Sequence, residues 1–160
     1  MDYLWTPWRY QYVRQAGPEQ ACLFCEVLQR NQDAETLILF RGRYNFILLN
    51  RYPYTTGHSM VAPYEHVAEL DQAPQETLAE MIHLCQRLQR GLAAEYKPEG
   101  YNLGMNLGRV AGAGVAGHLH MHVLARWGGD TSFMTTVGET RLEPEDLATT
   151  YTRLKRHFEK

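Results

Sequence analysis

The sequence predicts an α+β domain, an antiparallel sheet of about five strands with a long helix and a C-terminal helix packed on it. Three observations support this prediction. Short apolar runs between turn residues indicate strands. Residues 75–96 carry apolar side chains at helical spacing. Residues 118–125 alternate histidine with apolar side chains, which is the period of a strand. We expect residues 1–160 to form one domain, with residues 1–20 as an N-terminal arm.

Composition limits the classes of protein to consider. The chain of 160 residues is long enough for one sizeable core. Its net charge of -2 gives no reason to expect a nucleic-acid or membrane partner. No apolar stretch reaches the length of a membrane span, and the N-terminus lacks the basic and apolar regions of a signal peptide. Three cysteines, an odd number, suit a reducing compartment, so we expect a cytoplasmic protein.

The N-terminal region contains aromatic residues and then a pair of cysteines. Residues 4–10 hold two tryptophans around Pro7, and this arm would pack on its own domain, on a partner subunit or against substrate. Cys22 and Cys25 form a Cys-x-x-Cys pair before a short predicted helix at residues 26–30. Such a pair indicates either zinc binding or redox chemistry. The β-rich sequence that follows favours zinc, provided that two further ligands exist.

The middle of the chain predicts strands and helices in a clear order. Four segments are typical of strands, namely residues 37–40, 45–50, 58–62 and 101–108. The first two would form a hairpin, and Pro53 and Gly57 mark a turn before the third. A short helix is predicted at residues 65–70 and a long one at 75–96. The C-terminal helix should begin near Leu147, after an acidic and proline-containing start.

The histidine stretch at residues 118–125 is the strongest functional signal. In a strand, His118, His120 and His122 would project from one face, while the apolar residues between them anchor the other. The ten preceding residues, 108–117, contain four glycines, whose backbone N–H groups could approach a phosphate closely. The last predicted strand would pair antiparallel with residues 101–108. Neutral histidines beside an anion-binding loop suggest attack on phosphorus.

This stretch resembles the motif of the histidine triad (HIT) superfamily, in which three histidines alternate with apolar residues. Residues 118–130, which end in Arg-Trp-Gly-Gly-Asp, are most similar to the diadenosine tetraphosphate phosphorylases within that superfamily. The segment at residues 4–9, Leu-Trp-Thr-Pro-Trp-Arg, and the Asn-to-Gly-His turn at residues 50–58 extend the resemblance. The resemblance implies a HIT-like fold and nucleotidyl transfer on dinucleoside polyphosphates.

The resemblance also implies roles for individual residues. His120 would be the nucleophile, His122 would stabilise the phosphoryl oxygens, and His118 would orient the strand. Asn50 would hold the ribose hydroxyls, and Leu48 would touch the base. Spacing alone does not rank the three histidines.

Further substrate-binding residues follow from the same resemblance. Asn106 would contact the region of the scissile phosphate, and Trp127 would either shape the acceptor pocket or pack at the strand end. Gly112, Gly114 and Gly117 would offer backbone N–H groups to the phosphates. The related phosphorylases commonly carry serine where this chain has Gly114, which leaves phosphate binding to the backbone. Inorganic phosphate would be the acceptor.

Some members of the superfamily bind zinc through a Cys-x-x-Cys pair, a distant histidine and the first histidine of the catalytic strand. Carried over to this chain, that set is Cys22, Cys25, His66 and His118, a closed tetrahedral site of structural zinc. HIT proteins of this size are usually homodimers, so a homodimer is expected. Two other activities stay open: a HIT hydrolase that uses water on dinucleoside polyphosphates or nucleoside phosphoramidates, and a zinc- and nucleotide-binding module without turnover.

Overall fold

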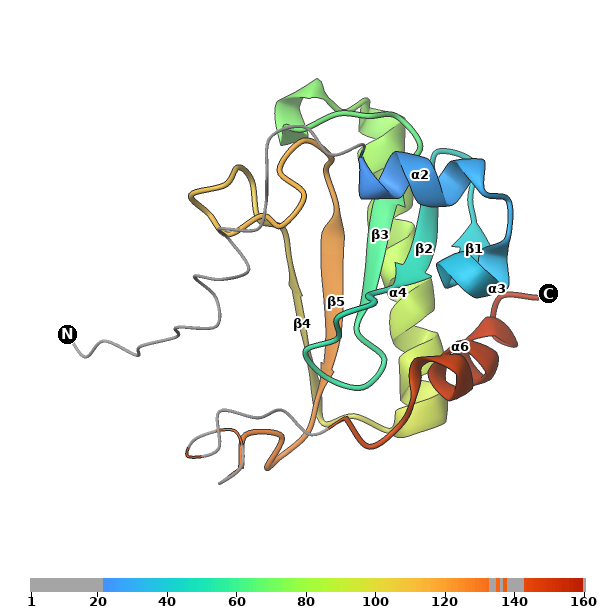
Figure 1. Cartoon of the computed structure of the whole chain (residues 1–160), viewed down its shortest axis with the longest axis vertical. Coiled ribbons are helices and arrows are strands. Elements are labelled where there is room, and N and C mark those ends of the chain that lie inside the picture. Colours follow the sequence, from blue (N-terminus) through green and yellow to red (C-terminus); the bar gives the residue numbers. More distant parts are fainter. Residues whose placement is uncertain (1–21, 133–134, 136, 138–142, 160) are drawn as a thin grey trace.

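The computed structural model describes residues 22–132, 135, 137 and 143–159. The N-terminal arm at residues 1–20 lies outside the described residues, and so does its expected packing. Within the described part, one sheet and its flanking helices form the arrangement in Figure 1.

The sheet has five strands in the order β1-β2-β3-β5-β4, and every neighbouring pair is antiparallel. The strands are β1 (Ile38–Arg41), β2 (Asn45–Leu49), β3 (Ser59–Pro63), β4 (Gly100–Gly104) and β5 (Met121–Arg126). The predicted fold class is therefore confirmed, as is the antiparallel pairing of the histidine strand with the strand that precedes the glycine loop.

The helices are α2 (Leu23–Gln29), α3 (Asp33–Thr36), the 3₁₀ helix η1 (Leu70–Gln72), α4 (Gln75–Tyr96) and α6 (Leu147–Lys155). The bounds of α4 match the prediction, because its apolar stripe continues until Lys97 takes a left-handed conformation with φ of 46°. The predicted helix at residues 65–70 is wrong. The backbone there instead brings the carbonyl of Val67 to the N–H of Leu119, at 2.7 Å. Residues 118–120 therefore lie beside this segment, and β5 begins only at Met121.

Apolar layers lie on both faces of the sheet. On one face, Val123 packs with Leu88 of α4 and Leu154 of α6 in a single buried cluster. On the other face, Phe24 of α2 packs with Leu48 and its neighbours in a second cluster. Figure 1 shows α2 and α4 on opposite sides of the strands. Side chains alternate between the two faces along a strand. Since the residues between the histidines face α4, the histidines face the α2 side.

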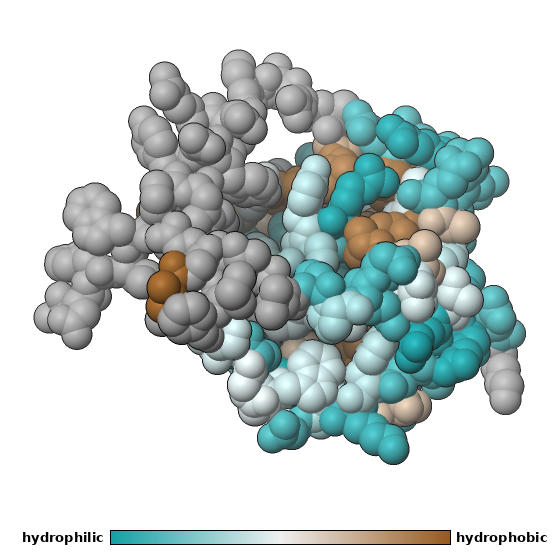
Figure 2. Space-filling model, turned by 60° about the horizontal axis from the view of Figure 1, so that its bottom comes forward, coloured by the Kyte–Doolittle hydropathy of each residue, from teal (hydrophilic) through white to brown (hydrophobic). Residues whose placement is uncertain are grey.

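The described surface is mainly polar in the view of Figure 2, with hydrophobic residues in small patches. None of the described helices is both long and apolar enough to cross a membrane.

Candidate active site and metal site

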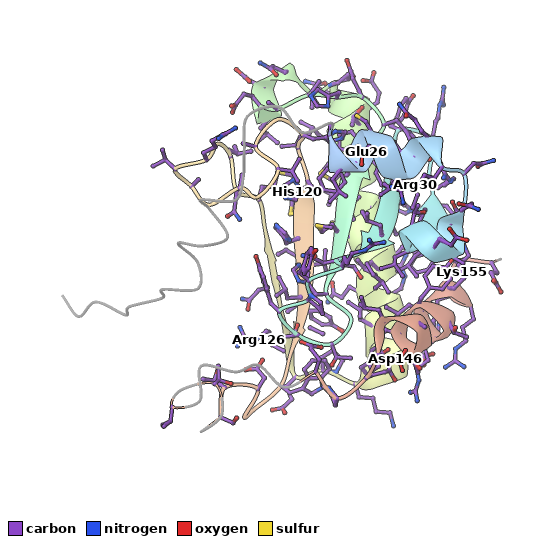
Figure 3. The ribbon with its side chains drawn as sticks, viewed as in Figure 1. Glu26, Arg30, His120, Arg126, Asp146 and Lys155 are labelled. Atoms are coloured by element: carbon purple, nitrogen blue, oxygen red, sulfur yellow. The ribbon has the colours of Figure 1, made fainter. Side chains whose placement is uncertain are left out.

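The three histidines of the motif lie in one row on the α2 side of the sheet. The rings of His118 and His120 each have their centroid 5.0 Å from that of Phe24. The rings of His120 and His122 are 4.9 Å apart. Figure 3 shows His120 beside the start of β5 and next to α2. The single face predicted from the alternation is therefore present, although only His122 lies within the hydrogen-bonded strand.

His118, at one end of the row, meets the cysteine pair. Its Nδ1 atom lies 3.3 Å from Sγ of Cys22 and 3.8 Å from Sγ of Cys25. Cys25 Sγ is also 3.4 Å from Nδ1 of His66. The four ligand atoms all lie within 4.8 Å of one another, so the predicted set is brought together in one cluster. The Nε2–H group of His118 donates to the carbonyl of Pro63 at 2.9 Å. Because the neutral ring has one N–H group, Nδ1 carries a lone pair, and this lone pair faces the sulfurs.

This cluster fits a tetrahedral metal ion. Zinc bonds of about 2.3 Å to sulfur and about 2.0 Å to nitrogen would separate neighbouring ligand atoms by roughly 3.3–3.8 Å in a tetrahedron. The observed distances of 3.3, 3.4 and 3.8 Å lie in that range. Two thiolates, formed when the cysteines lose their protons, and two imidazoles are also a donor set that zinc accepts. The four residues could therefore hold one metal ion.

His120, the middle histidine, has its tautomer set by the backbone. Its Nδ1 atom lies 2.8 Å from the carbonyl oxygen of His118, which can only accept a hydrogen bond. The neutral ring has one N–H group, so Nδ1 donates and Nε2 carries a lone pair. His120 is 5% exposed, and burial lowers its pKa below the ordinary value. A lone pair on an uncharged imidazole is what a nucleophile requires.

His122, at the other end of the row, contacts a fourth histidine that the sequence analysis did not assign. His58 Nε2 lies 2.9 Å from Nδ1 of His122. The backbone N–H of Tyr54 donates to Nδ1 of His58 at 3.1 Å, so the neutral ring of His58 has its hydrogen on Nε2 and donates it to His122. His122 thus accepts at Nδ1 and has its own hydrogen on Nε2. Its Nε2–H group is available as a donor.

The pKa of His122 falls to about 4, first because burial penalises the charged ring and then because His120 would repel it. Burial also lowers the pKa of His118. All three histidines of the row are therefore neutral near pH 7, and the tautomer assignments above apply there.

The place of His58 beside His122 follows from the pairing of β3 with β5. It is the last residue of the turn predicted from Pro53 and Gly57, and it directly precedes β3. The register places Met60 opposite His122, so His58, two residues earlier, shares that face. That register is not visible in the sequence. The Gly-His pair at the end of the turn was the available signal.

The predicted nucleoside-binding residues lie near the same end. Leu48 pairs with Met60, which pairs with His122, so their side chains form one row across the sheet. The side-chain amide of Asn50 lies 3.4 Å from Nδ1 of His58. Asn106 lies two residues beyond Gly104, which is the partner of His122 and the last residue of β4.

Other predicted binding residues have different surroundings. Gly112 lies in the glycine loop with φ of 93°, and Gly114 lies in the same loop. A Cβ atom at Gly117 would come within 3.7 Å of His66, so this glycine lies beside the Cys/His cluster. Trp127 follows the far end of β5. Its indole N–H donates to the carbonyl of Tyr96 at 3.2 Å, and its ring packs on the core, as in the packing alternative.

Comparison with known proteins agrees with these features. The family model of the HIT domain matches residues 31–129, more than half of the chain. The chain belongs to the HIT family. It is 39% identical over 155 residues to the AP-4-A phosphorylase of Mycobacterium tuberculosis, with 92% of this chain and 79% of that protein covered.

Two further HIT relatives bear on the site. Adenosine 5'-monophosphoramidase HNT1 of Saccharomyces cerevisiae is 27% identical over 108 residues, which cover 68% of this chain and 64% of that protein. The crystal structure of a zinc-bound histidine triad family protein from Mycobacterium smegmatis has a TM-score of 0.69 and 28% identity, covering 86% of this chain and 92% of that one. The prediction of a HIT enzyme is thus confirmed at the level of the family.

Proposed function

We propose that this HIT protein transfers a nucleotidyl group from a dinucleoside polyphosphate, of the AP-4-A kind, to inorganic phosphate through a nucleotidyl-histidine. The observation that carries the proposal is the tautomer of His120. Its Nδ1–H is held by the carbonyl of His118, and the lone pair on Nε2 is left for attack. The relative that is 39% identical and is named AP-4-A phosphorylase supports the choice of substrate and acceptor.

In the first step, Nε2 of His120 attacks the α-phosphorus of the substrate. A P–N bond forms, and the bond from phosphorus to the bridging oxygen breaks. With diadenosine tetraphosphate, ATP leaves and AMP stays on the histidine. Dividing one displacement into two easier ones is the advantage of covalent catalysis. The Nε2–H of His122, fixed by the hydrogen bond from His58, would donate to a phosphoryl oxygen and stabilise the charge that develops there.

In the second step, an oxygen of inorganic phosphate attacks the same phosphorus. The P–N bond breaks, the lone pair returns to Nε2 of His120, and ADP forms. Water in place of phosphate would give AMP. Because Gly114 has no hydroxyl, backbone N–H groups of the glycine loop, from Gly112 to Gly117, would hold the phosphates.

The nucleoside would lie at the His122 end of the row. Asn50 is suited to the ribose hydroxyls because its amide both donates and accepts. Leu48 would contact the base, and Asn106 would lie near the scissile phosphate. Trp127 packs on the core in this chain, so a role in the acceptor pocket rests on the resemblance alone.

We also propose that Cys22, Cys25, His66 and His118 hold one structural zinc ion. The tetrahedral distances and the zinc-bound relative at 28% identity support this. When bound, zinc would stabilise the two thiolates and fix α2 against the histidine segment. A homodimer is proposed as well; the sheet edge at β4 has no further strand among the described residues.

The experiment is a turnover assay with diadenosine tetraphosphate, with and without phosphate, in which AMP and ADP are quantified. ADP that rises with phosphate at the expense of AMP supports the phosphorylase. AMP alone at every phosphate concentration means a hydrolase, which the relative named as a monophosphoramidase makes the second candidate. Binding of the dinucleotide with neither product would identify a zinc- and nucleotide-binding module instead, and the proposal would fail.

A further inference from the structure

The connection between β2 and β3, residues 50–58, is stabilised by its own hydrogen bonds. The N–H of Asn50 donates to the carbonyl of His58 at 2.9 Å, and the side-chain oxygen of Asn50 accepts from the N–H of Tyr52, also at 2.9 Å. Gly57 has φ of 76°, and a Cβ atom there would come within 2.7 Å of Leu92. A fixed loop of this kind can place a side chain reproducibly over a site.

Tyr54 contacts the His58–His122 pair in two ways. Its backbone N–H donates to Nδ1 of His58, which favours hydrogen on Nε2 of His58 and so on Nε2 of His122. Alanine at position 54 would keep this N–H and remove only the ring. Its ring centroid lies 4.7 Å from that of His58 and 6.3 Å from that of His122, with the latter ring inclined by only 26°. The ring thus lies against both histidines, and the residue is 47% exposed to solvent.

We propose that Tyr54 is a positioning residue, which holds His58 and His122 in a single tautomer by covering the hydrogen bond between them. The expected effect on turnover rests on the function proposed above, whereas the effect on the tautomers does not. The two imidazoles each have one donor and one acceptor, so the pair could bind in either direction or through water. The N–H of Tyr54 favours one direction. Its ring excludes the water that would compete for Nδ1 of His122 and Nε2 of His58.

The alternative role for an exposed ring beside a nucleotide site is direct contact with substrate, such as stacking on a base. The two roles differ in what they change. Loss of a ring that stacks on substrate would raise KM. Loss of a ring that positions His122 would lower kcat and leave KM nearly unchanged, because His122 acts on charge that develops in the transition state.

The test compares Tyr54→Ala, Tyr54→Phe and Tyr52→Ala. Tyr52 is the matched control, because it lies in the same loop and is 74% exposed. Its hydrogen bond to Asn50 is donated by the backbone N–H, which alanine would keep. We expect Tyr54→Ala to lower kcat by about 10-fold, the range seen when a group that orients a catalytic residue is lost. KM should change by less than about twofold. Tyr54→Phe keeps the ring and should restore most of kcat, and Tyr52→Ala should match the parent protein.

A second readout does not depend on turnover. The ¹⁵N chemical shifts of the His58 and His122 rings in the free protein report which nitrogen carries hydrogen. The parent, Tyr54→Phe and Tyr52→Ala should each show one tautomer for both rings. Tyr54→Ala keeps the backbone N–H but lets water reach Nδ1 of His122 and Nε2 of His58, so its shifts should be averaged.

The outcomes separate the two proposals. Averaged shifts in Tyr54→Ala, together with a parent protein that turns over no dinucleotide, would uphold the positioning role and refute the proposed function. Unchanged shifts, a change confined to KM, or a loss in Tyr54→Phe as large as in Tyr54→Ala would each overturn the positioning role.

Discussion

The two ends of the histidine row differ in what holds each ring. His118 is buried between the carbonyl of Pro63 and two cysteine sulfurs, and it belongs to a cluster suited to a metal. His122 receives a hydrogen bond from another histidine, and that histidine is oriented by a loop with exposed tyrosines. Identical residues at identical spacing have thus come to different environments.

The difference shows that the partner of each ring decides its chemistry. The carbonyl at Nε2 of His118 leaves Nδ1 for the cluster, whereas the donor at Nδ1 of His122 leaves Nε2–H for a ligand. Between them, His120 is bound by the carbonyl of His118 and has a lone pair on Nε2. The His118 end is therefore expected to act mainly on stability and metal content, and the His122 end mainly on the rate of catalysis.

The largest effect is expected at the middle of the row. His120→Ala removes the proposed nucleophile and should lower kcat by at least about 10³-fold, because no other group in the row presents a lone pair to substrate. Dinucleotide binding should persist, since Asn50 and the glycine loop remain. Turnover and calorimetric binding measure the two effects, with His83→Ala on the exposed side of α4 as a control. Turnover retained in His120→Ala would refute the assignment.

A smaller loss is expected at the His122 end. His122→Ala should lower kcat by about 10²-fold, in the range of a lost hydrogen-bond donor to a developing charge. His58→Ala should lose nearly as much, because it removes the group that fixes the hydrogen on His122. The double variant should then be no worse than His122→Ala alone, since the two residues act as a unit. Losses that multiply in the double variant would mean that His58 acts independently of His122.

The sequence predicted the His118 end better than the His122 end. Cys-x-x-Cys is a local pattern with few meanings, and the resemblance supplied the remaining two ligands, which the fold brings together. The role of His58 depends on the register between β3 and β5, which juxtaposes residues 64 positions apart. Hydrophobic pattern predicts that strands pair but not which residues of distant strands lie opposite each other.

The fold was predicted more fully than its irregular parts. Strong periodicity gave α4 at its full length and all five strands of the sheet, although residues 105–108, predicted as strand, lie beyond the end of β4. The helix expected at residues 65–70 failed because that backbone bonds to Leu119 rather than to itself. Such long-range competition for backbone groups has no local signature. The hydrogen bond from Leu119 to Val67 also explains why β5 starts three residues later than the histidine alternation suggests.

At the His118 end, Cys22→Ser should show itself in metal content and stability. The variant should lose the metal, and its Tm should fall by roughly 5 °C, which for a chain of this size corresponds to about 2 kcal/mol. This is far below the contribution in small zinc domains, because a large core remains without the metal. We expect kcat to fall by about 10-fold, since Phe24 of α2 packs on both His118 and His120.

Metal analysis and thermal unfolding measure this prediction. Cys85→Ala is the control, because Cys85 is buried in the core away from the cluster and its substitution should leave the metal in place. The proposed difference between the two ends would be refuted if Cys22→Ser kept its metal, or if His58→Ala lowered metal content as much as Cys22→Ser does.

The smallest expected effect is a change in KM that shows on which side of His122 the substrate lies. Gly104 of β4 is directly opposite His122, so a methyl group there would project on the same face, and no atom of the described residues lies within 4 Å of it. Gly100 is also on β4, faces the same side and is equally open, but it is opposite Arg126 at the far end of β5. Neither glycine has a positive φ, so alanine should fit at both positions, and stability should change by no more than about 0.5 kcal/mol.

If substrate lies over His122 from the β4 side, Gly104→Ala should raise KM by about 10-fold, as a small misplacement of bound substrate does, while Gly100→Ala should leave KM unchanged. Equal KM values for the two variants would place the substrate on the other side of His122, next to Tyr54 and Leu48.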